Sequence, residues 1–170
     1  MTDDPAPERV RPGQHLDERG TLTEHLEWLR ATVVHKVSGL SDGQAFSRPV
    51  PASELTPAGL VKHLTGTERW WFSIDFADAD VPHPWPDGDP GGGFPIEPGD
   101  TLTALVAAYR AECGRSRRVV AAAQLDDASR GALVPPFTLR FALTHMIEET
   151  ARHCGHLDLL RESIDGARGQ

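Results

Sequence analysis

The sequence contains only two cysteines, Cys113 and Cys154, and neither stands in a Cys-x-x-Cys pair. Two cysteines cannot build the disulfide framework of a small secreted protein, and the missing pair argues against a redox motif or a zinc ribbon. Both residues fall on the apolar side of a helical pattern. We therefore expect two free thiols that serve as small core residues.

The chain also lacks a long apolar run. None of its 170 residues lies in a stretch that approaches the ~18–20 apolar residues needed to cross a bilayer. The first residues, MTDDPAPERVRPGQ, have neither the basic nor the apolar region of a secretory signal. We expect a cytoplasmic protein with no membrane partner.

Positive charge is scarce as well. The chain has 17 Lys plus Arg against 25 Asp plus Glu, for a formal net charge of -8. Proteins that bind nucleic-acid phosphates normally cluster Lys and Arg, and the one basic cluster here, Arg115, Arg117 and Arg118, is too short to reverse the acidic balance. We expect no nucleic-acid partner.

Four stretches do carry apolar residues at three- and four-residue spacing, which predicts four amphipathic helices. No alternating pattern of comparable strength predicts a strand. Residues 1–16 hold few large apolar groups, so we expect a flexible N-terminal segment followed by a single domain over residues 17–170. The sequence therefore predicts an all-α protein, with a four-helix bundle as its architecture.

Capping residues and glycines predict the helix boundaries. They are an end near Gly39 for the first helix, Thr56-Pro57 and Ala77 for the second, Asp100 at the start of the third, and Thr138 and Gly166 for the fourth. The segment SDGQAFSRPVP after the first helix is predicted to form a turn.

A long loop, within which lie residues 80–99, separates the second and third helices. Its repeated Pro, Gly and Asp prevent a helix or a central strand, and loops of this length often act as lids or binding loops. Trp70 and Trp71 lie two turns after His63 and are predicted to pack in the core or to line a pocket. His83 and Trp85 in the loop are placed to cover such a pocket.

The fourth helix carries the most informative pattern. His145, Glu149, His153 and His156 follow the spacing i, i+4, i+8, i+11, which places them within roughly 80° of arc. They form one polar stripe on the flank of the buried face. A ligand group there can reach inward and still meet solvent.

A metal site follows from this stripe on one condition. A carboxylate and an imidazole one turn apart can bind the same divalent metal. If the second helix packs beside the fourth, His63 joins Glu149 and His153 in a two-histidine, one-carboxylate site with an open position, the pattern of a catalytic metal site. A Glu-x-x-x-His pair is also common as a plain surface contact. His145 and His156 could be ligands, partners of ligands or substrate-facing groups, and spacing does not separate these roles.

Three segments resemble the DinB/YfiT-like superfamily, and most closely its actinobacterial branch. They are LEWLRATVVHKVSGLSDGQAFSRPVP, TPAGLVKHLTGTERWWF and LTHMIEETARHCGHLDLLRESIDG, within a resemblance that spans about residues 17–166. The resemblance implies a four-helix bundle in up-down-down-up order, often a homodimer, that holds a divalent metal, usually zinc or nickel. The long loop fits the crossover that such a topology requires.

The resemblance also implies a ligand set. The first histidine ligand of the superfamily matches His63 in LVKHLTG. Where many members carry a histidine pair on the last helix, this chain has Glu149 and His153, as in the mycothiol-dependent maleylpyruvate isomerase. His156 stands where many relatives carry glutamine.

The sequence leaves three functions open. The resemblance implies a metal-dependent S-transferase or isomerase that acts on a small-molecule substrate with a low-molecular-weight thiol, mycothiol in actinobacteria. His63, Glu149 and His153 would hold the metal, and His145 or His156 would assist proton transfer or orientation. The alternatives are a metal-dependent hydrolase that activates water at the open position and a non-catalytic metal-binding stress-response protein.

Overall fold

The computed structural model describes residues 8–85 and 96–168, and in this part of the chain every long element is helical. The elements are α1 (Glu18–Val37), α2 (Asp42–Ala45), α3 (Pro57–Glu68), the π-helical segment η1 (Arg69–Phe76), α4 (Leu102–Ala121) and α5 (Leu139–Asp165). Because η1 continues α3, the long helices among the described residues number four. The one β-type contact among the described residues is an isolated bridge between Ala128 and Thr138. The predicted all-α four-helix bundle is confirmed.

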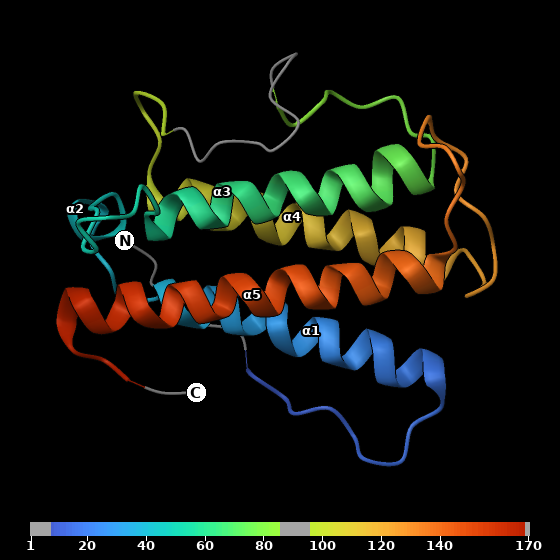
Figure 1. Ribbon diagram of the computed structural model, residues 1–170, viewed down its shortest axis with the longest axis horizontal. Helices are drawn as coiled ribbons and strands as arrows, with labels where there is room; N and C mark the ends of the chain where they lie inside the picture. The colour runs from blue at the N-terminus through green and yellow to red at the C-terminus, as the bar shows by residue number, and fades with distance from the viewer. Residues whose placement is uncertain (1–7, 86–95, 169–170) are drawn as a thin grey trace.

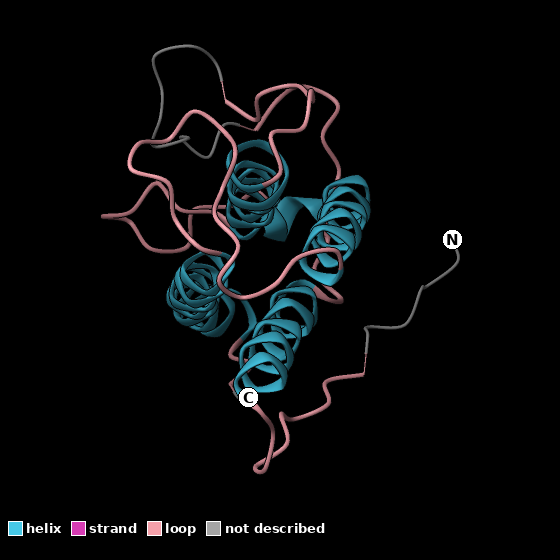
Figure 2. Cartoon of the chain, turned by 90° about the vertical axis from the view of Figure 1, so that its right-hand side faces the viewer, coloured by secondary structure: helices cyan, strands magenta, loops and turns pink. Residues whose placement is uncertain are grey.

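The order of the helices follows the predicted up-down-down-up topology. In Figure 1, α1 and α5 run in one direction, whereas α3 and α4 run in the opposite direction. Figure 2 shows the long helices nearly end-on, around a common centre. Since α3 and α4 are parallel neighbours, the chain must return along the bundle between them. Part of the predicted 80–99 loop that makes this return, residues 86–95, lies outside the described residues.

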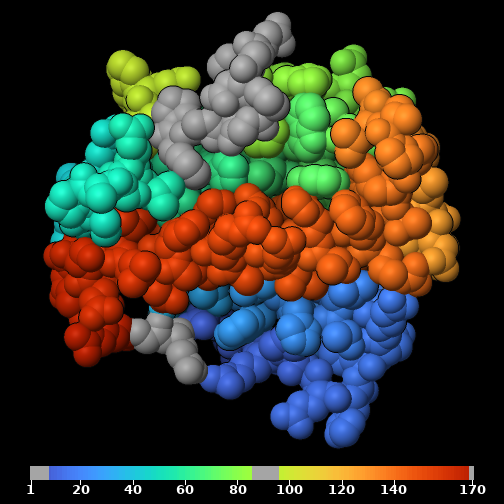
Figure 3. All heavy atoms as spheres, viewed as in Figure 1, coloured from blue at the N-terminus to red at the C-terminus, as the bar shows by residue number. Residues whose placement is uncertain are grey.

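Helix packing brings α3 and α5 together. α5 contacts α1 most extensively and also packs against α3, while α3 packs against α4. In Figure 3, α5 crosses the middle of the visible face as an orange-to-red band, with α1 in blue below it. The condition on which the predicted metal site depends, an α3 that lies beside α5, is therefore met.

Most of the predicted caps are observed. The side chains of Thr56 and Thr138 accept hydrogen bonds from backbone N–H groups at the starts of α3 and α5, and Gly166 ends α5 with a φ of 73°. The cap predicted at Asp100 is wrong, because Thr101 caps α4. The Asp100 carboxylate instead accepts from the backbone N–H of Glu97 and from Lys62, so it closes the preceding turn.

Two local structures differ from the sequence prediction. The turn predicted after α1 contains one helical turn, α2, which a reciprocal pair of hydrogen bonds between Ser41 and Gln44 closes. The second helix ends at Phe76, next to the predicted end near Ala77, but its last eight residues are π-helical. The wider turn buries Phe72 and Phe76 and leaves Trp71 half-buried at the surface facing α5. A repeat of 3.6 residues does not reveal such a segment, although π-turns are frequent at functional sites.

Both cysteines are free and lie in the apolar interior, as predicted. Cys113 is 2% exposed and Cys154 is 7% exposed. Burial raises the pKa of the Cys154 thiol to about 12, and burial also raises the pKa of Cys113. Neither side chain supplies a thiolate at neutral pH. Among the described helices, none is both long and apolar enough to cross a membrane.

Gly131 provides a test of how tightly the α4–α5 connection packs. A Cβ atom at Gly131 would lie 2.7 Å from the backbone of Asp75 and 2.7 Å from the carbonyl oxygen of Ile74. Backbone atoms cannot rotate away, so we expect Gly131→Ala to lower the free energy of unfolding by about 1–3 kcal/mol in urea denaturation. Gly155→Ala is the control, because a Cβ there meets nothing within 4 Å. Equal stability of Gly131→Ala and the wild type would contradict this packing.

Candidate metal centre

The structure brings His63, Glu149 and His153 together between α3 and α5. Glu149 Oε1 lies 3.0 Å from His63 Nε2 and 3.0 Å from His153 Nε2. One ligand atom from each side chain lies within 4.8 Å of the others. Over residues 8–85 and 96–168, this is the one group of three or more such side chains that could hold a metal ion.

Helical geometry explains how the three side chains converge. Leu60 and Leu64, on either side of His63 along α3, are fully buried, and they hold this face of α3 against the core. Glu149 and His153 are one turn apart on α5, so their side chains project from the same face. His63 is 9% exposed and His153 is 6% exposed, and the carboxylate of Glu149 remains partly open to solvent. The site therefore lies at the edge of the core, as the sequence pattern predicts.

The carboxylate at the centre of the site is ionised at neutral pH. Hydrogen bonds from His153 and His63 hold the pKa of Glu149 far below its usual range, against the opposing effect of burial. Its second oxygen, Oε2, accepts a hydrogen bond from Arg152 at 3.3 Å. Sequence reasoning did not single out Arg152, although its position three residues after Glu149 on the same helix is the signal that could have found it.

The two remaining histidines lie in different surroundings. His156 Nδ1 is 3.2 Å from His153 Nδ1, the ring nitrogen that points away from Glu149. Burial and the nearby charges of His153 and Arg152 lower the pKa of His156. His145 does not join the group: its ring lies against Trp71, with ring centroids 4.2 Å apart, and stacks on Phe141.

The geometry of the three donors fits a divalent metal. Four ligand atoms at ~2.0–2.2 Å from a tetrahedral zinc ion lie roughly 3.3 Å from one another. The two distances from Glu149 Oε1, 3.0 Å each, are close to that value. Two imidazoles and one carboxylate are also a ligand set found in catalytic zinc sites, where the fourth position stays open. The three ligand atoms all lie within 4.8 Å of one another, so the residues present fit a zinc ion once the side chains move closer together around it.

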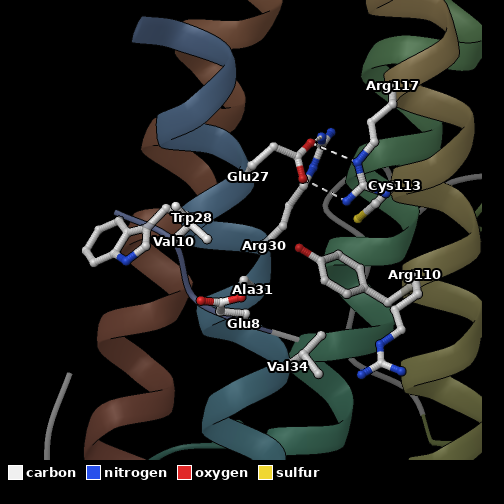
Figure 4. Close-up of a pocket in the computed structure, with 11 residues that line it drawn as sticks. Glu8, Val10, Glu27, Trp28, Arg30, Ala31, Val34, Arg110, Cys113 and Arg117 are labelled. Carbon is white, nitrogen blue, oxygen red and sulfur yellow. Dashed lines mark hydrogen bonds and ion pairs between the residues drawn. The ribbon is translucent and has the colours of Figure 1, made fainter. Parts of the chain in front are cut away.

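A cavity of about 570 Å³ lies elsewhere, between α1 and α4. Figure 4 shows Glu27 of α1 facing Arg117 of α4 at this cavity. The Arg117 Nη2 atom donates to Glu27 Oε2 at 2.7 Å, and Nε donates to Oε1 at 2.9 Å. Both charges are therefore engaged with each other. This cavity does not include the donor group on α3 and α5.

Known proteins share the fold and the sequence pattern of this chain. A crystal structure of a conserved protein from Enterococcus faecalis has a similar fold, with a TM-score of 0.67 and 15% sequence identity over 90% of this chain and 100% of the other. At that identity the likeness concerns the fold alone. The curated proteins contain no match. A family model described as Mycothiol-S-transferase matches residues 21–166. The predicted DinB/YfiT-like resemblance is thereby confirmed, and the chain belongs to the Mycothiol-S-transferase family.

Proposed function

We propose that this protein is a zinc-dependent transferase that moves the sulfur of a low-molecular-weight thiol, mycothiol, onto a small electrophile. The observation that carries the proposal is the convergence of two imidazole nitrogens on one carboxylate oxygen, at 3.0 Å each, in a chain of the Mycothiol-S-transferase family. Such a donor set leaves a position for a further ligand. The homodimer and the cytoplasmic location remain predictions.

The side chains have distinct roles in this proposal. His63, Glu149 and His153 hold the metal, and the ionised state of Glu149 supplies a negative charge to it. A bound divalent metal supplies one chemical effect, since it lowers the pKa of a coordinating thiol and so provides a thiolate at neutral pH. In the overall reaction, the S–H bond is replaced by an S–C bond, the bond between that carbon and the leaving group breaks, and the thiol proton passes to the leaving group or to the buffer.

His156 positions His153 in this scheme. To offer a lone pair from Nε2, a neutral His153 must carry its proton on Nδ1. The His156 Nδ1 atom, 3.2 Å away, can then accept a hydrogen bond from His153 Nδ1–H. Such a partner fixes both the tautomer and the ring orientation of a ligand. His145, packed between Trp71 and Phe141, remains a candidate for contact with the substrate.

The test is conjugation of mycothiol by zinc-loaded protein purified without a histidine tag. We expect a conjugate with an electrophile such as iodoacetamide, detected by mass spectrometry above the rate without protein. A chelator should abolish the enzymatic rate, and Glu149→Gln should lower it at least ~100-fold. Glu148→Gln is the matched control, because Glu148 precedes Glu149 on α5 and is largely exposed.

Other results would overturn the proposal. Hydrolysis of ester or amide substrates without any thiol would indicate a hydrolase. A protein inert toward mycothiol and electrophiles, whose melting temperature nevertheless rises with zinc, would indicate a non-catalytic metal-binding role.

A further inference from the structure

We propose that Trp85, seated against Gly66 of α3, forms an aromatic wall beside the candidate metal centre and that this wall binds a planar aromatic electrophile. The inference rests on the proposed function and names the class of second substrate. It follows from the placement of the rings around His63 and Glu149.

The indole of Trp85 packs directly on Gly66, which we call the seat of the indole. A Cβ atom on Gly66 would lie 3.0 Å from Cζ2 of Trp85 and 3.1 Å from both Cε2 and Nε1. The indole therefore lies directly against the helix backbone at the one residue type that has no side chain. Gly66 is three residues after His63, so the seat and the ligand lie on neighbouring turns of the same helix.

Trp85 adjoins the metal ligand. The ring centroids of Trp85 and His63 are 6.4 Å apart, with an angle of 33° between the planes. Trp70 extends the same surface, with its centroid 5.6 Å from that of Trp85, and His83 packs edge-on against Trp70 at 5.4 Å. Trp85 is only partly buried, so some of its surface stays available to a ligand.

A second set of rings lies on the α5 side of the donor group. His145 is one turn before Glu149 on α5, and it lies 4.2 Å from Trp71, centroid to centroid. Phe141, one turn further, stacks on His145 with an interplanar angle of 10° and is 51% exposed. Aromatic rings thus lie beside the α3 ligand and one turn before the α5 carboxylate.

The aromatic side chains on these surfaces favour an aromatic ligand. Aromatic faces favour other flat rings in offset-stacked or edge-to-face contact, and such contacts add to ordinary apolar burial. A planar electrophile stacked on Trp85 would have its reactive carbon held beside the metal centre. A small aliphatic electrophile would gain little from the same surface.

The experiment compares an aromatic with an aliphatic electrophile in zinc-loaded protein supplied with mycothiol. With 1-chloro-2,4-dinitrobenzene, the sulfur forms a bond to the ring carbon, the carbon–chlorine bond breaks, chloride leaves and the thiol proton passes to the buffer. We expect Trp85→Ala to lower kcat/KM for this substrate about 10-fold. The rate with iodoacetamide should change less than about 2-fold, and Trp85→Phe should restore most of the loss because it keeps a ring.

Gly66→Ala supplies a second variant that does not depend on removing the indole. Alanine favours a helix more than glycine, and its Cβ requires the indole of Trp85 to shift by a few tenths of an ångström from its seat. We expect Gly66→Ala to lower kcat/KM for the aromatic substrate and to leave the rate with iodoacetamide nearly unchanged. Gly114→Ala on α4 is the matched control, because the nearest atom to a Cβ there is a flexible Arg118 nitrogen at 4.0 Å.

Direct binding gives a readout that does not depend on activity. By calorimetry, unreactive 1,3-dinitrobenzene should bind wild-type protein about 10-fold more tightly than Trp85→Ala protein. If Trp85→Ala leaves both the affinity and the aromatic-to-aliphatic rate ratio unchanged, the aromatic wall is wrong although the proposed function stands. If the wild type conjugates neither electrophile, the proposed function fails. The affinities of wild-type and Trp85→Ala protein for dinitrobenzene then test by themselves whether the aromatic wall binds a planar ring.

Discussion

Zinc should bind to Glu149→Gln protein more than about 100-fold more weakly than to the wild type. Loss of a group that only orients a ligand typically weakens metal binding 10- to 100-fold, and loss of a ligand itself should exceed that range. Glutamine keeps the size of the side chain but removes the negative charge that both imidazoles contact at 3.0 Å. His63→Ala should have a comparable effect, because it removes the one donor from α3. Competition with a chromophoric chelator measures these affinities.

The neighbouring histidines make this prediction specific. His156→Ala should weaken zinc binding about 10- to 100-fold, since His156 contacts the ring of His153. His145→Ala should leave the affinity unchanged, because His145 packs among aromatic rings and lies outside the donor group. Glu148→Gln serves as the charge-matched control. If Glu149→Gln and His63→Ala both bound zinc as tightly as the wild type, the three residues would not be the metal ligands.

The largest effect on stability should come from the buried ion pair of Arg30 and Glu68. Arg30 Nε donates to Glu68 Oε1 at 2.7 Å, and Nη2 donates to Oε2 at 2.6 Å, between α1 and the end of α3. Arg30 is 4% exposed and Glu68 is fully buried. Burial by itself would lower the pKa of Arg30, but the charge and hydrogen bonds of Glu68, together with the charges of other neighbouring groups such as Glu27, outweigh burial and raise the pKa. Without Arg30, Glu68 would be an unpaired charge in the apolar interior, whereas Arg30 without Glu68 would keep Glu27 Oε1 as a partner at 2.7 Å.

We therefore expect Arg30→Ala to lower the free energy of unfolding by about 3–5 kcal/mol, and Glu68→Ala by somewhat less because Arg30 keeps Glu27 as a partner. Arg140→Ala is the control: Arg140 pairs with Glu18 and Asp126 on the surface, and such pairs contribute about 1 kcal/mol or less. The double variant Arg30→Met with Glu68→Leu should recover much of the loss, because it leaves no unpaired charge. Urea denaturation at neutral pH measures all four proteins, and a loss below ~1 kcal/mol in Glu68→Ala would contradict this account.

Local signals explain why the helices were predictable. The caps at Thr56 and Thr138 and the left-handed Gly166 depend on residues within one turn of the helix end, so the sequence alone indicates them. The prediction for Asp100 was wrong because an acidic residue just before the capping residue of a helix can close the preceding turn instead of capping the helix. The buried pair of Arg30 and Glu68 joins residues 38 apart in the chain, and no local pattern indicates such a partner.

The candidate site likewise has one part that local spacing predicts and another that depends on contacts between distant residues. The spacing of Glu149 and His153 on one helix placed them on a common face, and the structure has them so. The approach of His63 depends on which helices are neighbours, which helical periodicity leaves open and the family resemblance supplied. The packing of Trp85 on Gly66 was not predictable, because the sequence around a helical glycine does not indicate which distant side chain packs against it.

X-ray absorption at the zinc edge, recorded before and after addition of mycothiol, tests the central claim most directly. Without mycothiol, we predict a zinc environment of nitrogen and oxygen ligands only, because both cysteines are buried in the core and lie outside the donor group. With mycothiol, one sulfur ligand should appear in the zinc-loaded wild type. A sulfur ligand before mycothiol is added, or none afterwards in the zinc-loaded wild type, would contradict the account.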